Sequence, residues 1–243
     1  MHINDLKDTF AGSQKITIQD IIKFYEQFEK TTKRSTVDWR IHILVQNGIL
    51  YRISRGVYSL SKKEAKEYIP EINRLLKNLS RKIHKQFPFI ETCLWSTKWL
   101  NEFMLHQPGR FYVILEVERE VAESVFYALS DKRKDVFFSP SEEILNKYVI
   151  NSIEPIIITN LTTEAPTQEV QNVSTTTLEK ILVDIYCDPI LFSAYQGAEM
   201  RRIYQNAFEK YNLNEPKMMR YANRRGKKDE MYELICQFKK VDD

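Results

Sequence analysis

The spacing of apolar residues changes at Gly48, and this change restricts what the first part of the chain can form. Before Gly48, apolar residues recur every three or four positions in two runs, which a polar and basic stretch at 30–34 separates. After it, two runs of β-branched and aromatic residues flank a three-residue loop that ends in Gly56. The first pattern is typical of two short helices, and the second of a β-hairpin with a glycine bulge.

Capping residues support the positions of both helices. Thr17 followed by Asp20 has the spacing of a capping box before the first helix, and Ser35 or Thr36 can cap the second. Two helices followed by a tight hairpin is the order of a winged helix-turn-helix. We therefore predict this fold for residues 1–62, with a small structural α+β unit as the alternative.

Basic residues favour a DNA-binding role for this module. Residues 1–86 hold 17 Lys and Arg against 9 Asp and Glu, a net charge of +8. In a winged helix, the second helix enters the major groove and the hairpin lies against the backbone, so Arg40 is predicted to contact a guanine edge and the other cations phosphates. The predicted DNA-binding residues are Lys33, Arg34, Arg40, His42, Arg52 and Arg55.

The rest of the chain is predicted to hold a linker helix and a second domain. Apolar residues at helical spacing between Ile72 and Ile83 indicate a helix within 63–86, as a connector or an extension of the DNA surface. Beyond it, 87–243 alternates apolar strands with helices and ends in helices. We therefore expect an α+β protein, in which an α/β sheet domain with a helical C-terminus follows the winged helix.

One group of residues in the second domain has the order of a nucleotidyltransferase site. Such enzymes place two carboxylates at i and i+2 on a strand that follows a Gly-Ser turn and a helix, where they hold Mg²⁺ against a triphosphate. Ser96, Glu116 and Glu118 have this order, but Trp95 replaces the glycine. Asp135 and Glu154 are the acids available as a third ligand. The alternative is that both glutamates are surface acids at a strand end.

A second group of cations lies near the end of the chain. Residues 201–240 hold 11 Lys and Arg against 5 Asp and Glu, whereas 87–200 hold 8 against 17. The basic turn at 224–228 can bind nucleic acid or an acidic partner; the alternative is a solvated turn without a partner. The residues of this predicted second basic patch are Arg224, Arg225, Lys227 and Lys228.

Several classes of function are excluded by composition. The six glycines are isolated, so neither GxGxxG nor GxxxxGK[ST] can be written from them. Three widely spaced cysteines and four scattered histidines form no CxxC or HExxH, so we expect no disulfide framework, no metal and no cofactor. No apolar run approaches the length of a membrane span, and no signal-like stretch opens the sequence. We therefore expect a cytoplasmic protein without a membrane partner.

Two stretches carry a resemblance to a known family. The sequence Gln46-Asn47-Gly48-Ile49-Leu50-Tyr51-Arg52-Ile53-Ser54-Arg55-Gly56-Val57-Tyr58 resembles the helix end and the wing of the AbiEi antitoxins of type IV toxin–antitoxin systems. The sequence Val173-Ser174-Thr175-Thr176-Thr177-Leu178-Glu179-Lys180, which enters the C-terminal helices, resembles their downstream domain.

The resemblance implies a non-enzymatic antitoxin and autorepressor. Its winged helix would bind inverted repeats in its own promoter as double-stranded DNA, with two copies on a two-fold operator. Its second domain, related to nucleotidyltransferases but without their activity, would counteract a separate nucleotidyltransferase toxin. Two other functions stay open: an Mg²⁺-dependent nucleotidyltransferase that uses Glu116 and Glu118, and an adaptor whose winged helix binds protein.

Overall fold

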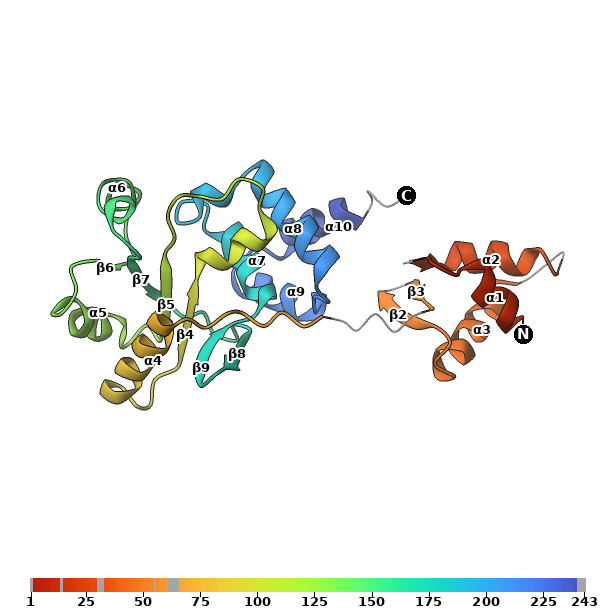
Figure 1. Cartoon of the computed structure of the whole chain (residues 1–243), viewed down its shortest axis with the longest axis horizontal. Coiled ribbons are helices and arrows are strands. Elements are labelled where there is room, and N and C mark those ends of the chain that lie inside the picture. The colour runs from red at the N-terminus through yellow and green to blue at the C-terminus, as the bar shows by residue number, and fades with distance from the viewer. Residues whose placement is uncertain (1, 14, 30–32, 55, 61–65, 240–243) are drawn as a thin grey trace. The chain divides into compact units, whose positions relative to one another are not determined.

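The protein divides into two units, which are described separately here (Figure 1). Unit 1 comprises Met1–Lys66 and unit 2 comprises Glu67–Asp243. The computed structural model describes residues 2–13, 15–29, 33–54, 56–60 and 66–239.

The described part of unit 1 contains three helices and a three-stranded antiparallel sheet. In the sheet, the strand that is third in the sequence lies between the first and the second. The register of the hairpin shifts between Arg52 and Ser54. The described elements are α1 (Ile3–Thr9), β1 (Ile16–Thr17), α2 (Ile18–Glu26), α3 (Arg34–Gln46), β2 (Tyr51–Ser54) and β3 (Val57–Ser59). The predicted helices and hairpin are therefore present, and α1 and β1 are additions that the sequence pattern did not reveal.

Local signals explain where the helices of unit 1 begin and end. The Thr17 and Asp20 side chains each accept a hydrogen bond from the other residue's backbone N–H, so the predicted capping box is confirmed. Helix α3 begins earlier than predicted, at Arg34, and its N-cap Lys33 makes no side-chain cap. Gly48 follows this helix with φ +67°, a left-handed conformation that glycine adopts without a steric cost.

The centre of unit 2 is a four-stranded sheet. Its order is β4-β5-β7-β6, in which β5, β7 and β6 are parallel and β4 is antiparallel to β5. The strands are β4 (Thr92–Ser96), β5 (Val113–Val117), β6 (Val136–Phe138) and β7 (Ile156–Asn160). Alternate residues of a strand face opposite sides, so Trp95 and Ile114 enter one core while Leu94 and Leu115 enter the other.

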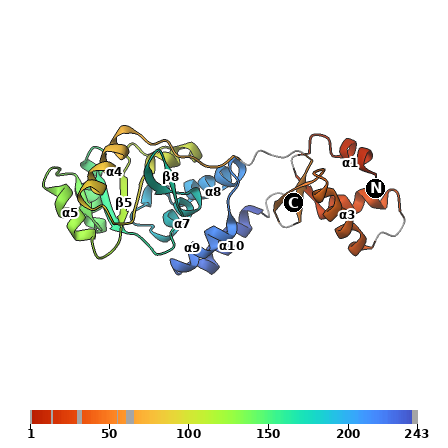
Figure 2. The same cartoon turned by 90° about the horizontal axis from the view of Figure 1, so that it is seen from below.

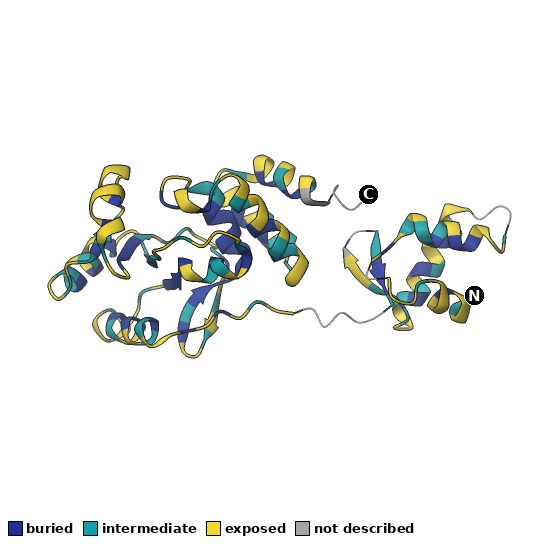
Figure 3. Ribbon diagram, turned by 45° about the horizontal axis from the view of Figure 1, so that its top comes forward, coloured by how far each residue is buried: buried dark blue, intermediate teal, exposed yellow. Residues whose placement is uncertain are grey.

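Different helices cover the two faces of this sheet. Helices α4 (Arg74–Gln86) and α5 (Ala122–Ser130) supply the core on one face. The other face is covered by the C-terminal helices, and both views show α4 and α5 on the opposite side from these (Figures 1 and 2). The C-terminal helices are α7 (Leu178–Cys187), α8 (Ala198–Lys210), α9 (Glu215–Arg224) and α10 (Lys228–Lys239). Helix α7 is the central one, since it is buried from Leu178 through Ile185 (Figure 3).

Shorter elements complete unit 2. A second sheet is formed by the hairpin of β8 (Thr167–Val170) and β9 (Val173–Thr176), whose two turn residues both have positive φ, as a tight type I′ turn requires. The remaining elements are η1 (Thr97–Phe103), α6 (Glu142–Lys147), η2 (Val149–Asn151) and η3 (Ser193–Tyr195). The mixture of helices and several small sheets agrees with the expected α+β class.

The expected linker helix over 63–86 is wrong in its extent and in its role. Within the described residues the helix begins only at Arg74, where the Asn73 side chain accepts a hydrogen bond from the Leu76 N–H at 2.9 Å. Its apolar side is buried in unit 2, so α4 belongs to that unit's core. Residues 63–65, at the start of the predicted range, lie outside the described residues.

The stretch 174–177, which leads into the C-terminal helices, is mostly a strand. Residues up to Thr176 form β9, and only Thr177 precedes α7 as its N-cap. The Ser174 and Thr175 hydroxyls donate hydrogen bonds to the Thr92 and Leu94 carbonyls at 2.6 and 2.7 Å. These hydroxyls therefore supply hydrogen-bond donors to the carbonyls on the edge of β4 that no strand of the four-stranded sheet pairs with. Within the described ranges, no helix has both the length and the apolar character needed to cross a membrane.

Candidate functional site

Helix α3 of unit 1 has one buried face and one exposed face. Val37, Ile41 and Leu44 are buried in the core of the unit. The exposed residues are Arg34, Ser35, Asp38, Trp39, His42 and Gln46. Trp39 is 60% exposed and is the largest apolar side chain on this exposed face. The sequence analysis did not single out Trp39. It lies two positions from both Val37 and Ile41, and two positions on a helix turn a side chain to the side opposite the buried face.

Arg40, the residue predicted to contact a guanine edge, is engaged within unit 1. Only 15% of its side chain is exposed, and Nη2 donates a hydrogen bond to Glu29 Oε1 at 2.7 Å. The guanidinium also lies over the Tyr25 ring, 4.4 Å from its centroid. Burial raises the pKa of Tyr25, while Arg40 acts in the opposite direction. Arg40 therefore links Glu29, just beyond α2, to α3, and little of its side chain is exposed.

The other predicted DNA-binding residues are placed differently. Lys33 is exposed and directly precedes α3. His42 is exposed within that helix. Arg34 is exposed and pairs with Asp38 at 3.2 Å, one turn along the same helix. Arg52 is exposed on β2, and Arg55 lies outside the described residues.

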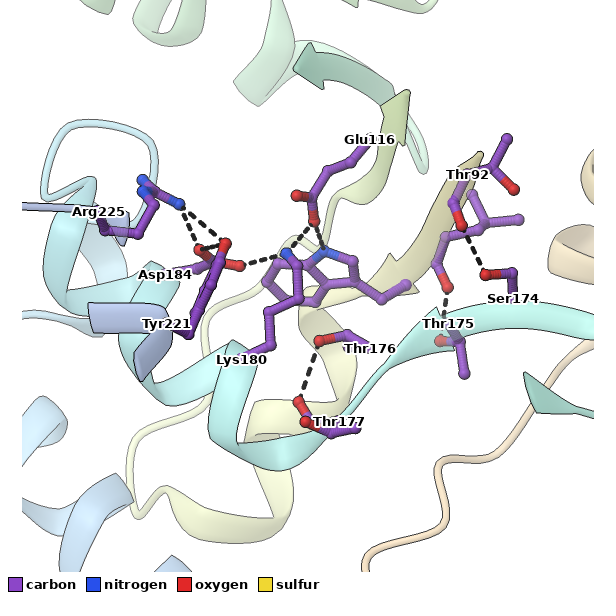
Figure 4. A network of polar contacts seen from close by, with 12 residues as sticks. Thr92, Glu116, Ser174, Thr175, Thr176, Thr177, Lys180, Asp184, Tyr221 and Arg225 are labelled. Carbon is purple, nitrogen blue, oxygen red and sulfur yellow. Dashed lines mark hydrogen bonds and ion pairs between the residues drawn. The ribbon is translucent and has the colours of Figure 1, made fainter. Parts of the chain in front are cut away.

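A network of buried charges lies in unit 2 between the sheet and the C-terminal helices (Figure 4). At its centre is Lys180, whose side chain has no exposed surface and whose Nζ contacts Glu116 Oε1 and Asp184 Oδ2 at 2.5 Å each. Asp184 also binds the Arg225 guanidinium and accepts a hydrogen bond from the Tyr221 hydroxyl at 2.8 Å. Trp95 Nε1 donates to Glu116 Oε1 at 2.9 Å.

The secondary structure explains how five of these side chains meet. Lys180 and Asp184 are four residues apart on α7, and Tyr221 and Arg225 are four apart at the end of α9, so each pair shares one helix face. Glu116 lies near the carboxyl end of β5 on the face that α7 covers. Two carboxylates and two cations make the network neutral, which is the condition for burying charges in a core.

Burial and pairing act against each other on the pKa values of the network. Burial raises the pKa of Glu116, and the Lys180 ammonium offsets part of that rise. For Lys180, burial alone lowers the pKa, but Asp184 and Glu116 hold it well above its ordinary value. Lys180 is therefore a charged ammonium that two carboxylates hold in place.

The structure does not assemble the expected nucleotidyltransferase ligands. Glu116 is engaged by Lys180 and Trp95, whereas Glu118 lies beyond the end of β5 and is half-buried. Asp135 and Glu154 precede β6 and β7, so they lie at the opposite end of the parallel strands from Glu116.

Ser96 and Asp135 have other partners. Ser96 is buried and accepts a hydrogen bond from the Lys98 N–H at 3.3 Å, which makes it the N-cap of η1. Asp135 pairs with Arg133, whose hydrogen bond holds the pKa of that carboxyl below its ordinary value. Among the described residues, no group of three or more His, Cys, Asp or Glu side chains is arranged to hold a metal ion.

The predicted second basic patch is not a continuous surface of unpaired cations. Arg225 is turned inward to Asp184, with 24% of its side chain exposed. Arg224 pairs with Glu164, and Lys227 with Glu230 at 2.9 Å. Lys228 is exposed at the start of α10. The patch is therefore corrected to a turn whose central arginine stabilises the buried network.

A cavity of about 200 Å³ lies beside the network. It is at the carboxyl ends of β5 and β7, the edge at which open α/β sheets place ligands. One part of its wall is apolar and aromatic, and the other part holds acidic, hydroxyl and amide groups together with the Arg225 guanidinium. The lining residues are Trp95, Ile114, Glu116, Thr159, Asn160, Thr162, Asp184, Asp188, Leu191, Phe192 and Arg225.

Sequence reasoning missed this site, although one signal was present. Glu179, Lys180 and Asp184 interrupt an apolar run from Leu178 to Ile185, and the last two are four residues apart. Charged residues four apart within such a run indicate a buried pair that needs partners of opposite charge. The sequence does not show that these partners come from β5 and α9.

Comparison with known proteins places the chain in a family. No curated protein matches it. The sequence model of a family of unknown function, DUF6577, matches residues 36–240, which include most of α3, the hairpin of unit 1 and nearly all of unit 2. Because the match covers most of the chain, the protein belongs to this family of unknown function.

Proposed function

We propose that the protein is a DNA-binding regulator whose unit 1 is a winged-helix module. The observation that carries this proposal is the exposed face of α3, with Trp39 at its centre, in a unit built as helix, strand, two helices and a hairpin. The pairing of β1 with β3 and of β3 with β2 supports the winged-helix interpretation. Residues 1–66 hold 12 Lys and Arg against 7 Asp and Glu, a net charge of +5 that suits a polyanion.

The residues of this face have separable roles in the proposal. Lys33 and Arg34, at the start of α3, contact phosphates, as does Arg52 on the hairpin. His42 and Gln46 contact base edges, because an amide can pair with adenine N6 and N7 and an imidazole with either donors or acceptors. Trp39 makes apolar contact with a thymine methyl group. Two copies on an inverted repeat would place two such helices in successive major grooves.

For unit 2 we propose the antitoxin role that the AbiEi resemblance implies. In this role the chain represses its own operon and counteracts a separate nucleotidyltransferase toxin. The position of Lys180 supports a unit without nucleotidyltransferase activity, because a divalent ion beside Glu116 would face a buried ammonium 2.5 Å from that carboxylate. Asp135 and Glu154, at the far end of the strands, supply no third ligand.

The DNA-binding part is tested by fluorescence anisotropy with a duplex from upstream of the chain's own reading frame and with a scrambled duplex. We expect salt-sensitive binding, with a log–log slope of about 0.9 for each contacted phosphate. Trp39→Ala should remove about 1–3 kcal/mol of discrimination between the two duplexes. Lys33→Ala should weaken both alike and reduce the slope by about 1. Lys134→Ala, an exposed lysine of unit 2, is the matched control. Binding that is absent or insensitive to salt would refute this part of the proposal.

The antitoxin part is tested by sequencing the reading frames beside this chain's own and co-expressing the chain with any nucleotidyltransferase encoded there. We expect growth to be restored by the full chain and by its Trp39→Ala variant, since the toxin is counteracted by unit 2. A separate assay with labelled nucleotides and Mg²⁺ should show no incorporation by the chain itself. Incorporation that Glu116→Gln abolishes would instead support the nucleotidyltransferase alternative.

A further inference from the structure

We propose that helix α4 of unit 2 binds the phosphate backbone of duplex DNA through a row of cations, without reading the base sequence. The choice of ligand rests on the function proposed for unit 1, but the residues belong to the other unit. Three features carry the proposal: the alignment of the cations, their lack of acidic partners and the charge of the rest of unit 2.

The first observation is the alignment of cations along α4. They recur at intervals of three or four residues, so they share one side of the helix, opposite the side that is buried in unit 2. The members of this cation row are Arg74, Lys77, Arg81 and Lys85. Lys77 is half-buried and the other three are exposed. The row is about 16 Å long, a distance over which one strand of B-DNA carries about five phosphates.

The second observation is that these cations lack acidic partners. The 13 residues of α4 include five Lys and Arg and no Asp or Glu. Within the part of the chain that the structure describes, no carboxylate forms an ion pair with the cation row, whereas Lys147 pairs with Glu143 and Lys227 with Glu230. Like charges four residues apart on a helix destabilise it, so the row costs stability that an anionic ligand would restore.

A further cation beside the row adds to this repulsion. Lys82 lies on α4 near the turn that follows α5. Partial burial lowers the pKa of Lys82, and the charges of Lys132 and Arg133 lower it further. Asp131 acts in the opposite direction, with the smallest of these influences on that pKa. Cations from two segments therefore meet here, and together they attract a polyanion.

The charge of the rest of unit 2 favours a narrow anionic partner. Residues 67–243 hold 24 Lys and Arg against 26 Asp and Glu, so the cation row is a positive strip on a unit that is slightly acidic overall. A flat anionic membrane would also face some of those acids, whereas a line of phosphates can contact the row alone. A strand of duplex DNA is such a line, with one charge for about each 3.4 Å of its axis.

The test measures how the affinity of the full chain for DNA depends on salt, by fluorescence anisotropy with the upstream and the scrambled duplex. The variant Arg81→Gln/Lys85→Gln removes two charges of the cation row and introduces residues that favour helices. We expect its log–log slope to fall by about 1.8, because each lost phosphate contact removes about 0.9. Its affinity for the two duplexes should fall by the same factor, since phosphate contacts carry no sequence information.

The matched control is Arg201→Gln/Arg202→Gln, which removes two exposed arginines from α8 and changes the net charge equally. Its slope should equal that of the unmodified chain. Urea denaturation should show no loss of stability in the α4 variant, because the cations that it removes repel their neighbours. Equal losses of slope in the two variants would reflect net charge alone and would overturn the proposal for α4.

The outcomes for the two units are distinguishable. A slope that Lys33→Ala lowers and the α4 variant leaves unchanged would overturn the proposal for α4 and keep that for unit 1. The reverse result would support α4 and refute unit 1. Vesicles of phosphatidylcholine and phosphatidylserine probe the other kind of anionic surface. If the α4 variant loses binding to the vesicles but keeps its slope on DNA, the row belongs to a membrane contact and the proposal fails.

Discussion

At the scale of single residues, Lys180 shows how one buried charge depends on its partners. Replacing it by Met leaves Glu116 buried without a cation and Asp184 with Arg225 alone, so we expect the free energy of unfolding to fall by about 3–5 kcal/mol. Urea denaturation measures this loss. Lys147→Met, which removes an exposed pair with Glu143, is the control and should cost less than about 1 kcal/mol. Equal losses in the two variants would contradict the proposed importance of burial.

Arg40 is the residue whose role the structure changed most. Arg40→Met removes the hydrogen bond to Glu29 and the contact with the Tyr25 ring, so we expect unit 1 to lose about 1–2 kcal/mol of stability. The ratio of its affinities for upstream and scrambled DNA should stay the same, because its guanidinium does not face outward. Urea denaturation measures the stability of unit 1, and fluorescence anisotropy measures the ratio of the two affinities. Unchanged stability with a lost preference would restore the base-contact interpretation.

At the scale of elements, the N-terminus of α2 links a local sequence signal to pH dependence. Hydrogen bonds from the Thr17 side chain and backbone lower the pKa of Asp20. The folded state therefore gains stability above the unfolded pKa of Asp, about 3.9, and loses it as the pH falls through the lower folded pKa. Thr17→Ala should cost about 1 kcal/mol at neutral pH. Its stability should also depend less on pH below about 4, as thermal melts across the acidic range can show.

Elements with a clear apolar period were predictable, and those defined by distant partners were not. The capping box, α3 and the hairpin follow from residues within a few positions of one another. The two-residue strand β1 exists because it pairs with β3, about forty residues away. Similarly, Ser174 and Thr175 have the composition of a helix cap, but they pair with β8 as part of β9, and their hydroxyls donate to carbonyls of the distant strand β4. Tertiary contacts decide such segments, and the local sequence does not contain them.

At the scale of the whole molecule, the division of charge follows the units less closely than the sequence suggested. Residues 1–86 carry a net charge of +8, but 67–86 belong to unit 2, so unit 1 retains +5. The buried network could not be assembled from the sequence for a related reason. Its members come from β4, β5, α7 and α9, which lie far apart in the chain and meet only when the helices close over the sheet.

The cores of the two units share no residues, and this predicts how the protein unfolds. The core of unit 1 lies within residues 3–60, and the two cores of unit 2 begin after residue 67. We therefore expect two calorimetric transitions. Leu44→Ala should lower only the transition of unit 1 and Leu182→Ala only that of unit 2, since truncating a fully buried leucine costs about 2–5 kcal/mol. If both variants shift one common transition, the units unfold together, and the effects of unit 2 ligands should then extend to unit 1.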